Sequence, residues 1–342
     1  MLTGILRVSK ESIFSGFNNP GCYTMLDEEF GCQFGLLEEE VLSLLQEHQV
    51  SCDLAEVRAW YNGYKVGSYH LYNPWSILQC IQKGGQLKPY WVNTSDNALI
   101  KELCLLGNDS FKQDLEDLVS GKSIRKPLEE GIVFPDLPLQ ENAIWNLLFF
   151  SGYLTLKTKP VYEDYGLQCQ LKIPNQEIHS LYQSMIQSWM RQYLSGSNQQ
   201  LLLKSLIRGD VETFAQVFQV LIFNSMSSYD LFEKEPERVY HAFVLGLLVS
   251  LDKTHEVKSN RESGFGRYDV CLIPKASSKL GIVLEFKKAG QGKTLEKACK
   301  EVLCQIEEKQ YVQELRQRGI QKILLLGIAF SGKKVLVLHK TS

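Results

Sequence analysis

Two acidic residues and a lysine near the C-terminus, Asp269, Glu285 and Lys287, have types that suit phosphate chemistry. Two carboxylates that face each other across a strand pair repel unless a cation lies between them. Mg²⁺ and Mn²⁺ are hard cations that take oxygen ligands. A lysine beside such an ion can orient an attacking water or steady the charge on a phosphate. These three residues therefore predict a divalent-metal site, provided that the fold brings them together.

The elements that must position them are two candidate strands, 267–274 and 281–287, with six turn-permitting residues between them. So short a connection favours an antiparallel hairpin. If the hairpin is symmetric about Ser277, Asp269 and Glu285 each lie eight residues from its midpoint. The two carboxylates would then face each other, with Cβ atoms roughly 5 Å apart.

Strand periodicity adds the lysine to this arrangement. Glu285 and Lys287 are two residues apart and share one face, while Phe286 points to the other. A one-residue slip in register would send Asp269 to the opposite face. The alternatives are structural: Asp269 paired with Arg267 in the hairpin, and Glu285 and Lys287 on the exposed face of an edge strand.

These residues resemble the PD-(D/E)xK nuclease superfamily, with Asp269 as its Asp and residues 285–287 as its ExK motif. The resemblance is closer to one bacterial branch, in which the nuclease domain follows an AAA-ATPase-like domain. That branch carries the pattern ESGxGRxD…EFK, which occurs here at 262–269 and 285–287. Further matches are Tyr240-His241-Ala242-Phe243 upstream, and Gln305-Ile306 and Tyr311 downstream.

The resemblance implies a restriction-endonuclease-like fold and more site residues. Glu237 is the implied third acidic metal ligand, with Glu235 and Glu233 as rivals. Gln305 would lie near the scissile phosphate, although an ordinary helix-surface role explains it equally well.

Two further residues are implied to contact the substrate. Arg267 is as consistent with a phosphate anchor as with a structural ion pair. Tyr311 is as consistent with a packing role as with a substrate contact.

The N-terminal residues 1–160 resemble the latter part of the ATPase-like domain of the same branch. The matching stretches are 3–5, 12–19, 60–64, 72–76 and 151–154. No P-loop of the form GxxxxGK[ST] occurs in the sequence, which argues against nucleotide hydrolysis. We expect a remnant kept as a scaffold or as a surface for a protein partner. The alternative is that the sequence is a fragment of a longer protein.

The polar stretch 225–232 marks the best domain boundary in this 342-residue chain. We expect an α-rich N-terminal lobe over 1–230 and an α/β nuclease-like domain with a small mixed sheet over 231–342. Charge supports the division, because residues 231–342 carry 20 Lys and Arg against 13 Asp and Glu, or +7. A polyanion would bind this part.

The expected elements follow from hydrophobic periodicity and turn residues. Expected helices are 36–50, 75–83, 95–106, 110–119, 141–150, most of 175–226, 236–251 and 294–318. Expected strands are 153–158, 255–259, 267–274, 281–287, 321–329 and 334–339.

The nine scattered cysteines contain no CxxC pair and predict reduced thiols rather than a zinc site or a disulfide framework. The apolar runs are too short to span a bilayer, and the N-terminus lacks a secretory pattern. We therefore expect a cytoplasmic protein without a membrane segment. The leading interpretation is a Mg²⁺- or Mn²⁺-dependent nuclease that favours DNA over RNA. The alternative is a catalytically idle nuclease-fold protein that acts as an interaction or secreted factor.

Overall fold

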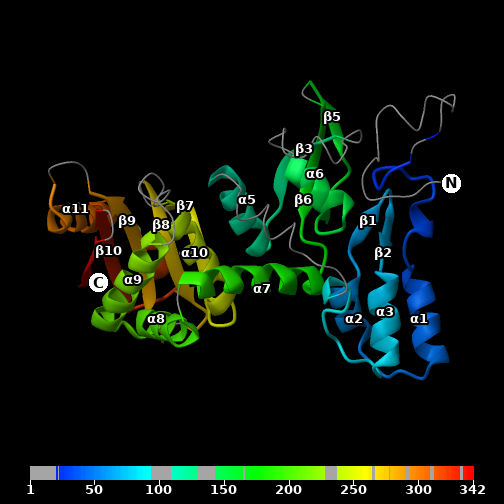
Figure 1. The fold of residues 1–342 in the computed structure, drawn as a ribbon, viewed down its shortest axis with the longest axis horizontal. Coiled ribbons are helices and arrows are strands. Elements are labelled where there is room, and N and C mark those ends of the chain that lie inside the picture. The colour runs from blue at the N-terminus through cyan, green and yellow to red at the C-terminus, as the bar shows by residue number, and fades with distance from the viewer. Residues whose placement is uncertain are drawn as a thin grey trace. The chain divides into compact units, whose positions relative to one another are not determined.

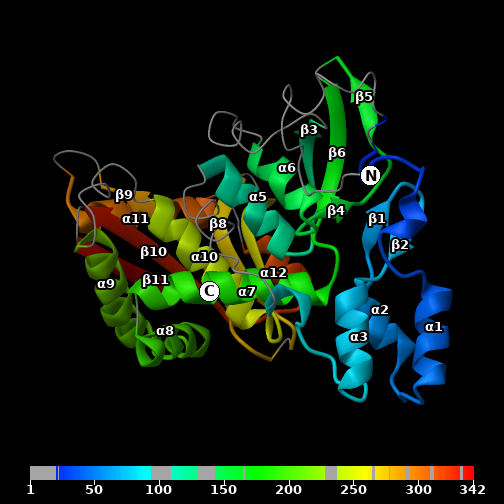
Figure 2. The same ribbon diagram turned by 45° about the vertical axis from the view of Figure 1, so that its right-hand side comes forward.

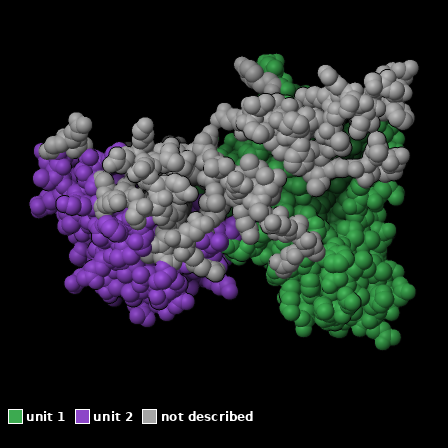
Figure 3. Space-filling view, viewed as in Figure 1, with its two compact units in different colours: residues 1–184 green, residues 185–342 purple. Residues whose placement is uncertain are grey.

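The computed structural model is a mixed α/β chain that divides into two compact units, Met1–Ser184 and Met185–Ser342 (Figures 1 and 3). It describes residues 21, 23–93, 109–129, 143–164, 166–193, 195–227, 237–263, 266–276, 278–289, 293–308, 312–331 and 334–342. Within these residues, none of the helices combines the length and the apolar composition needed to cross a bilayer.

The first part of the N-terminal unit packs three helices around a small apolar core. The helices are α1 (Glu38–Glu47), α2 (Leu54–Tyr61) and α3 (Pro74–Gln82), and short 3-10 turns lie at Gly31–Gln33 and Trp91–Asn93. Asn73 caps α3 by accepting from the amide of Ser76 at 3.2 Å. A two-stranded hairpin, β1 (Tyr64–Val66) and β2 (Tyr69–Leu71), follows α2. Tyr61 and Tyr72 are fully buried, so the aromatic turns at 60–64 and 72–76 are held on the core.

The rest of this unit is a small antiparallel sheet with helices beside it in the chain. Its strands are β3 (Ile124–Leu128), β4 (Thr155–Leu156), β5 (Val161–Glu163) and β6 (Gly166–Lys172), with β6 paired to the other three. Its helices are α5 (Asp109–Val119) and α6 (Ala143–Phe150), and α7 (Gln176–Tyr193) runs on from the sheet. Of these strands only β4 lies within an expected one, 153–158. The helix expected at 95–106 lies outside the described residues.

The C-terminal unit is built on a five-stranded sheet of order β11-β10-β9-β8-β7, in which β9 and β10 are parallel and the other pairs antiparallel. Figure 2 shows β9, β10 and β11 of this sheet with α11 beside them. The strands are β7 (His255–Ser263), β8 (Gly266–Pro274), β9 (Gly281–Lys288), β10 (Ile323–Ser331) and β11 (Lys334–Thr341). The helices are α8 (Gly196–Arg208), α9 (Val211–Ser227), α10 (Glu237–Leu251), α11 (Leu295–Glu308) and α12 (Gln313–Gln317).

Helices cover the two faces of this sheet. On one face, Val302, Leu303 and Ile306 of α11 pack with Cys271, Val283 and Leu325 of the strands. On the other face, Phe218 of α9 and Phe243 of α10 lie against Phe286 of β9, with ring centroids 6.3 Å apart in both pairs. Alternate residues of β9 therefore face different helices, as a two-sided buried strand requires.

The elements expected for residues 236–339 agree closely with the observed ones. The expected helix 294–318 is seen as α11 and α12, with residues 309–311 outside the described part of the chain. The compact units divide at 184/185, so α8 and α9 group with the C-terminal unit rather than with residues 1–184. The domain boundary at 230/231 stays a prediction.

Candidate active site

The β8–β9 hairpin has the register expected from its symmetry. Val270 pairs with Leu284, Cys271 with Val283, and Leu272 with Ile282. The two residues of each pair are therefore equally far in sequence from position 277. Continuing this register by one residue places Asp269 opposite Glu285. The symmetric hairpin is confirmed, with its pairing beginning at Leu272 and Ile282.

Hydrogen bonds join the two carboxylates to each other's strands. The amide of Asp269 donates to Oε2 of Glu285 at 3.1 Å, and the amide of Phe286 donates to Oδ2 of Asp269 at 2.7 Å. Glu285 is only 6% exposed, so its carboxylate lies inside the protein. The two acidic side chains thus lie side by side, as predicted.

Helix α11 supplies the next contact. Nε2 of Gln305 donates to Oε1 of Glu285 at 2.7 Å, which fixes the orientation of that carboxylate. Each carboxylate oxygen has two lone pairs, so a hydrogen bond to each still leaves acceptor capacity for a cation. Gln305 is therefore part of the site that the structure assembles.

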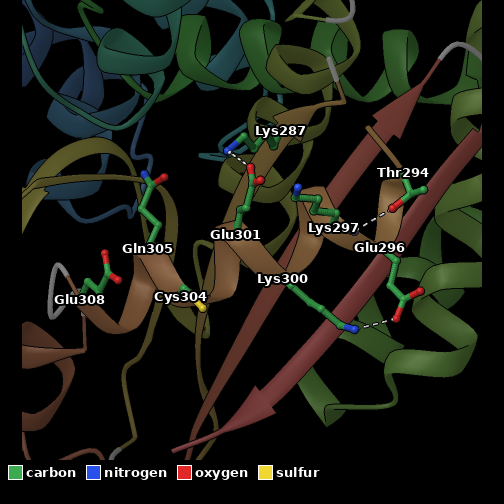
Figure 4. Close-up of a pocket in the computed structure, with 9 residues that line it drawn as sticks. All are labelled: Lys287, Thr294, Glu296, Lys297, Lys300, Glu301, Cys304, Gln305 and Glu308. Atoms are coloured by element: carbon green, nitrogen blue, oxygen red, sulfur yellow. Dashed lines mark hydrogen bonds and ion pairs between the residues drawn. The ribbon is translucent and has the colours of Figure 1, made fainter. Parts of the chain in front are cut away.

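Lys287 points to the same helix. Its Nζ lies 2.9 Å from Oε2 of Glu301 (Figure 4), and Nζ of Lys293 lies 3.0 Å from Oε1 of the same carboxylate. Glu285 and Lys287 both contact α11, while Phe286 packs against α9 and α10. The shared face of Glu285 and Lys287 is confirmed.

A pocket of about 770 Å³ opens on this side of the sheet, along α11 (Figure 4). Its lining includes Lys287 of β9 and Gln305, the residue that donates a hydrogen bond to Glu285. The other lining residues are Thr294, Glu296, Lys297, Lys300, Glu301, Cys304 and Glu308.

Gly327 of β10 lets α11 approach the site. It pairs with Glu285 in the parallel register and therefore lies beside it on the α11 face. A Cβ at this position would lie 2.9 Å from the carbonyl oxygen of Cys299 and 3.0 Å from Cγ of Leu303. Only a residue without a side chain allows the helix to come this close.

Burial and charge shift two carboxyl groups in opposite directions. Burial raises the pKa of Asp269, although the amide of Phe286 partly opposes the shift. The hydrogen bonds from Lys287 and Lys293 lower the pKa of Glu301 to about 2. Asp269 therefore carries a charge that burial disfavours, while the charge of Glu301 is neutralised by its partners.

The donor set at Asp269 and Glu285 fits a hard divalent cation. The buried carboxylate of Glu285 and the partly buried one of Asp269 come from neighbouring strands and offer the oxygen ligands that Mg²⁺ or Mn²⁺ prefers. Among the described side chains, no group of three or more acidic, His or Cys residues is placed to hold a metal. A third acidic ligand would have to come from elsewhere, and the side chain of Glu237, at the start of α10, is not described.

Other predicted residues also lack a described side chain. The backbone of Arg267 lies in β8, paired with Glu262, but its side chain is not described. Tyr311, Glu235 and Glu233 lie outside the described residues. Glu301, Lys293 and Gly327 were not among the predicted site residues. The spacing offered one clue to Glu301, which precedes Gln305 by four residues and so shares its helix face.

Comparison with known proteins agrees with this arrangement. Residues 235–340 match the family model of the PD-(D/E)XK nuclease superfamily. The matched segment contains Asp269, Glu285, Lys287 and Gln305. The match agrees with the superfamily resemblance of residues 235–340. It does not cover the N-terminal residues that resemble an ATPase-like domain.

A curated relative matches over most of the chain. It is described as "Uncharacterized protein in vnfD 5'region" of Azotobacter chroococcum mcd 1, and it is 26% identical over 338 residues. The match covers 97% of this chain but 60% of the relative, so the chain spans less than two thirds of the relative's length.

Proposed function

We propose that the nuclease-superfamily segment, residues 235–340, is a divalent-metal-dependent nuclease that hydrolyses phosphodiester bonds. The observation that carries the proposal is the pairing of Asp269 with Glu285 on the face of the sheet that also presents Lys287 and Gln305. The family match is an independent support, because nucleases of this superfamily generally use divalent metal ions.

The carboxylates of Asp269 and Glu285 would hold Mg²⁺ or Mn²⁺, with Glu237 proposed as a third ligand. When bound, the ion would polarise the phosphate and lower the pKa of a water molecule. Two side chains of the protein would assist the ion. Gln305 keeps the Glu285 carboxylate in one orientation, and Lys287 donates hydrogen bonds to the attacking water or to a phosphate oxygen. Arg267 and Tyr311 are proposed substrate contacts.

The substrate class proposed is nucleic acid, with DNA favoured over RNA. The charge of +7 over residues 231–342, from 20 basic and 13 acidic residues, suits a polyanion. The preference for DNA rests on the sequence resemblance alone, so the test includes RNA.

For the N-terminal unit we propose a scaffold or protein-partner role, as a remnant of an ATPase-like domain. The support is the resemblance of its aromatic turns, which the structure holds on a compact core through Tyr61 and Tyr72. A cytoplasmic location is likewise a proposal.

The test is cleavage of supercoiled plasmid, single-stranded DNA and RNA with Mn²⁺ or Mg²⁺, and with EDTA. We expect metal-dependent cleavage that Asp269→Ala and Lys287→Ala each reduce by about 10²-fold or more. Lys288→Ala is the matched control, because this neighbouring lysine is exposed and points to the opposite side of β9. Cleavage that persists in both site variants would contradict the assignment. Inactive wild-type protein that binds no metal would favour the idle, partner-binding alternative.

A further inference from the structure

The carboxylate of Glu301 lies between two ammonium groups at the edge of the candidate site. Nζ of Lys287 is 2.9 Å from its Oε2, and Nζ of Lys293 is 3.0 Å from Oε1 and 3.2 Å from Oε2. The side chains of Lys287 and Glu301 are 38% and 31% exposed. One carboxylate thus ties the proposed water-positioning lysine of β9 to α11.

A second ion pair on the same helix provides a comparison. Nζ of Lys300 lies 2.8 Å from Oε1 of Glu296, but these side chains are 66% and 64% exposed. Exposed pairs of this kind restrict their side chains little, because water competes for both groups. The pair of Lys287 and Glu301 is roughly half as exposed and links two elements, so it restricts the lysine more.

The contact of Glu301 with Lys287 has the same spacing as the contact of Gln305 with Glu285. Glu301 and Gln305 are four residues apart on α11, which is about 6 Å along a helix. Glu285 and Lys287 are two residues apart on β9, which is about 6.6 Å along a strand. One turn of α11 therefore reaches both residues, with Gln305 on Glu285 and Glu301 on Lys287.

We propose that Glu301 is a positioning residue that holds the Lys287 ammonium beside the acidic pair. This inference rests on the proposed nuclease function. A free lysine side chain has four rotatable bonds and samples many rotamers, whereas one hydrogen bond to a fixed carboxylate removes most of that freedom. An ammonium has three donors, so two remain for a water or a phosphate oxygen. Lys293 donates to both oxygens of the same carboxylate, so the three groups together carry one net positive charge.

The competing interpretation is that Glu301 blocks the site by occupying Lys287 in place of a substrate phosphate. The two interpretations predict opposite effects of removing the carboxylate. A positioning residue gives a loss of turnover, and a competing anion gives a gain in substrate binding and turnover. The arrangement of α11 favours positioning, because Gln305 on the same helix face orients Glu285 without blocking it.

The experiment measures kcat and KM for plasmid cleavage with Mn²⁺ in Glu301→Gln, Glu301→Asp and Glu296→Gln. We expect Glu301→Gln to lower kcat by about 10- to 100-fold with little change in KM, because the lysine is misplaced rather than lost. Glu301→Asp should restore part of kcat. Glu296→Gln removes a carboxylate of the same pocket that does not contact Lys287, so it should lower kcat much less than Glu301→Gln does.

A double variant shows whether Glu301 acts through Lys287. Glu301→Gln should cost little more in the Lys287→Ala background, because its effect depends on the lysine. A full additional loss there, or a kcat of Glu301→Gln at or above wild type, would overturn the proposal.

A second test of the contact between Glu301 and Lys287 does not depend on nuclease activity. Labelling of lysines with an amine-reactive reagent, followed by peptide mass spectrometry, should modify Lys287 faster in Glu301→Gln than in wild type, with Lys288 as the internal reference. Equal rates at Lys287 would overturn the positioning role whatever the activity. Inactive wild-type protein with the expected change in labelling would contradict the nuclease proposal and still support the hold of Glu301 on Lys287.

Discussion

At the scale of the residue, Asp269 occupies a position that disfavours its own charge. Its side chain is partly buried, and this burial raises its pKa. A carboxylate in such a place destabilises the fold at neutral pH, unless a cation offsets it. Residues that lower stability in this way are common at functional sites.

The sign of this effect gives a prediction for Asp269→Asn. Because the folded pKa is raised above the ordinary value of 3.8, the folded state holds the proton more tightly than the unfolded state. Stability therefore falls as pH rises between those two pKa values, and the full cost is present at pH 7. Asp269→Asn should raise the Tm of the metal-free protein at pH 7, and the gain should shrink as pH falls toward 4.

Thermal unfolding in EDTA checks this prediction. Asp252→Asn, at an exposed position, should leave the Tm unchanged at both pH values. A lower Tm of Asp269→Asn at pH 7 would show that the buried charge is stabilised by the protein itself.

The acidic pair and most of its neighbours could be predicted from the sequence, because strand alternation and a short connection determine which side chains meet. Asp269, Glu285 and Lys287 follow from those two rules, and Gln305 from the family pattern. Glu301 could not be predicted, because a glutamate on a helix rich in Glu and Lys looks like a solvent-exposed residue. Its contact depends on how closely α11 packs on the sheet.

At the scale of the element, that close packing depends on Gly327. Gly327 lies beside Glu285 on β10, and α11 crosses it with Cys299 and Leu303 in contact range. The helix carries Glu301 and Gln305, so its distance from the sheet sets both contacts to β9.

Gly327→Ala should push α11 away from the sheet. The added methyl group would meet a backbone carbonyl at 2.9 Å, so the helix must move, at a cost of about 1–3 kcal/mol. We expect a lower Tm and a fall in kcat, because Gln305 and Glu301 move with the helix. Gly196→Ala is the control, since nothing lies within 4 Å of a Cβ there. Full activity in Gly327→Ala would show that the site does not depend on this approach.

Strands were predicted unevenly for physical reasons. Around the site, β9 and β10 contain clear apolar runs, at 281–284 and 323–330, which the sequence shows. By contrast, β3 has the sequence IRKPL, with two charges and a proline, so its composition argues against a strand. In β6, Leu167, Cys169 and Leu171 are buried in alternation with polar residues between them, so the sequence of this strand does indicate a strand.

At the scale of the whole molecule, burial and composition suggest different boundaries. The polar stretch 225–232 suggests a division at 230/231, whereas the compact units divide at 184/185. Phe214 and Phe218 of α9 are 1% exposed and pack with Phe243 of α10, which is fully buried. A fragment that begins at 231 would expose this aromatic face of the sheet.

Two fragments of the chain, 185–342 and 231–342, distinguish between these two boundaries. Residues 185–342 should unfold cooperatively, because they keep α9 over Phe243 and Phe286, with α8 packed on α9. Residues 231–342 should aggregate or lack a cooperative transition, since a large apolar face is left uncovered. Thermal unfolding followed by circular dichroism checks both. A cooperative transition in 231–342 would support the boundary suggested by composition.

The central claim is that Asp269 and Glu285 together hold a divalent cation, and calorimetric titration with Mn²⁺ tests it most directly. We expect saturable binding to the wild-type protein and to Asp252→Ala, and no detectable binding to the double variant Asp269→Ala/Glu285→Ala. Mn²⁺ binding that is unchanged in the double variant, or absent from the wild type, would contradict the account.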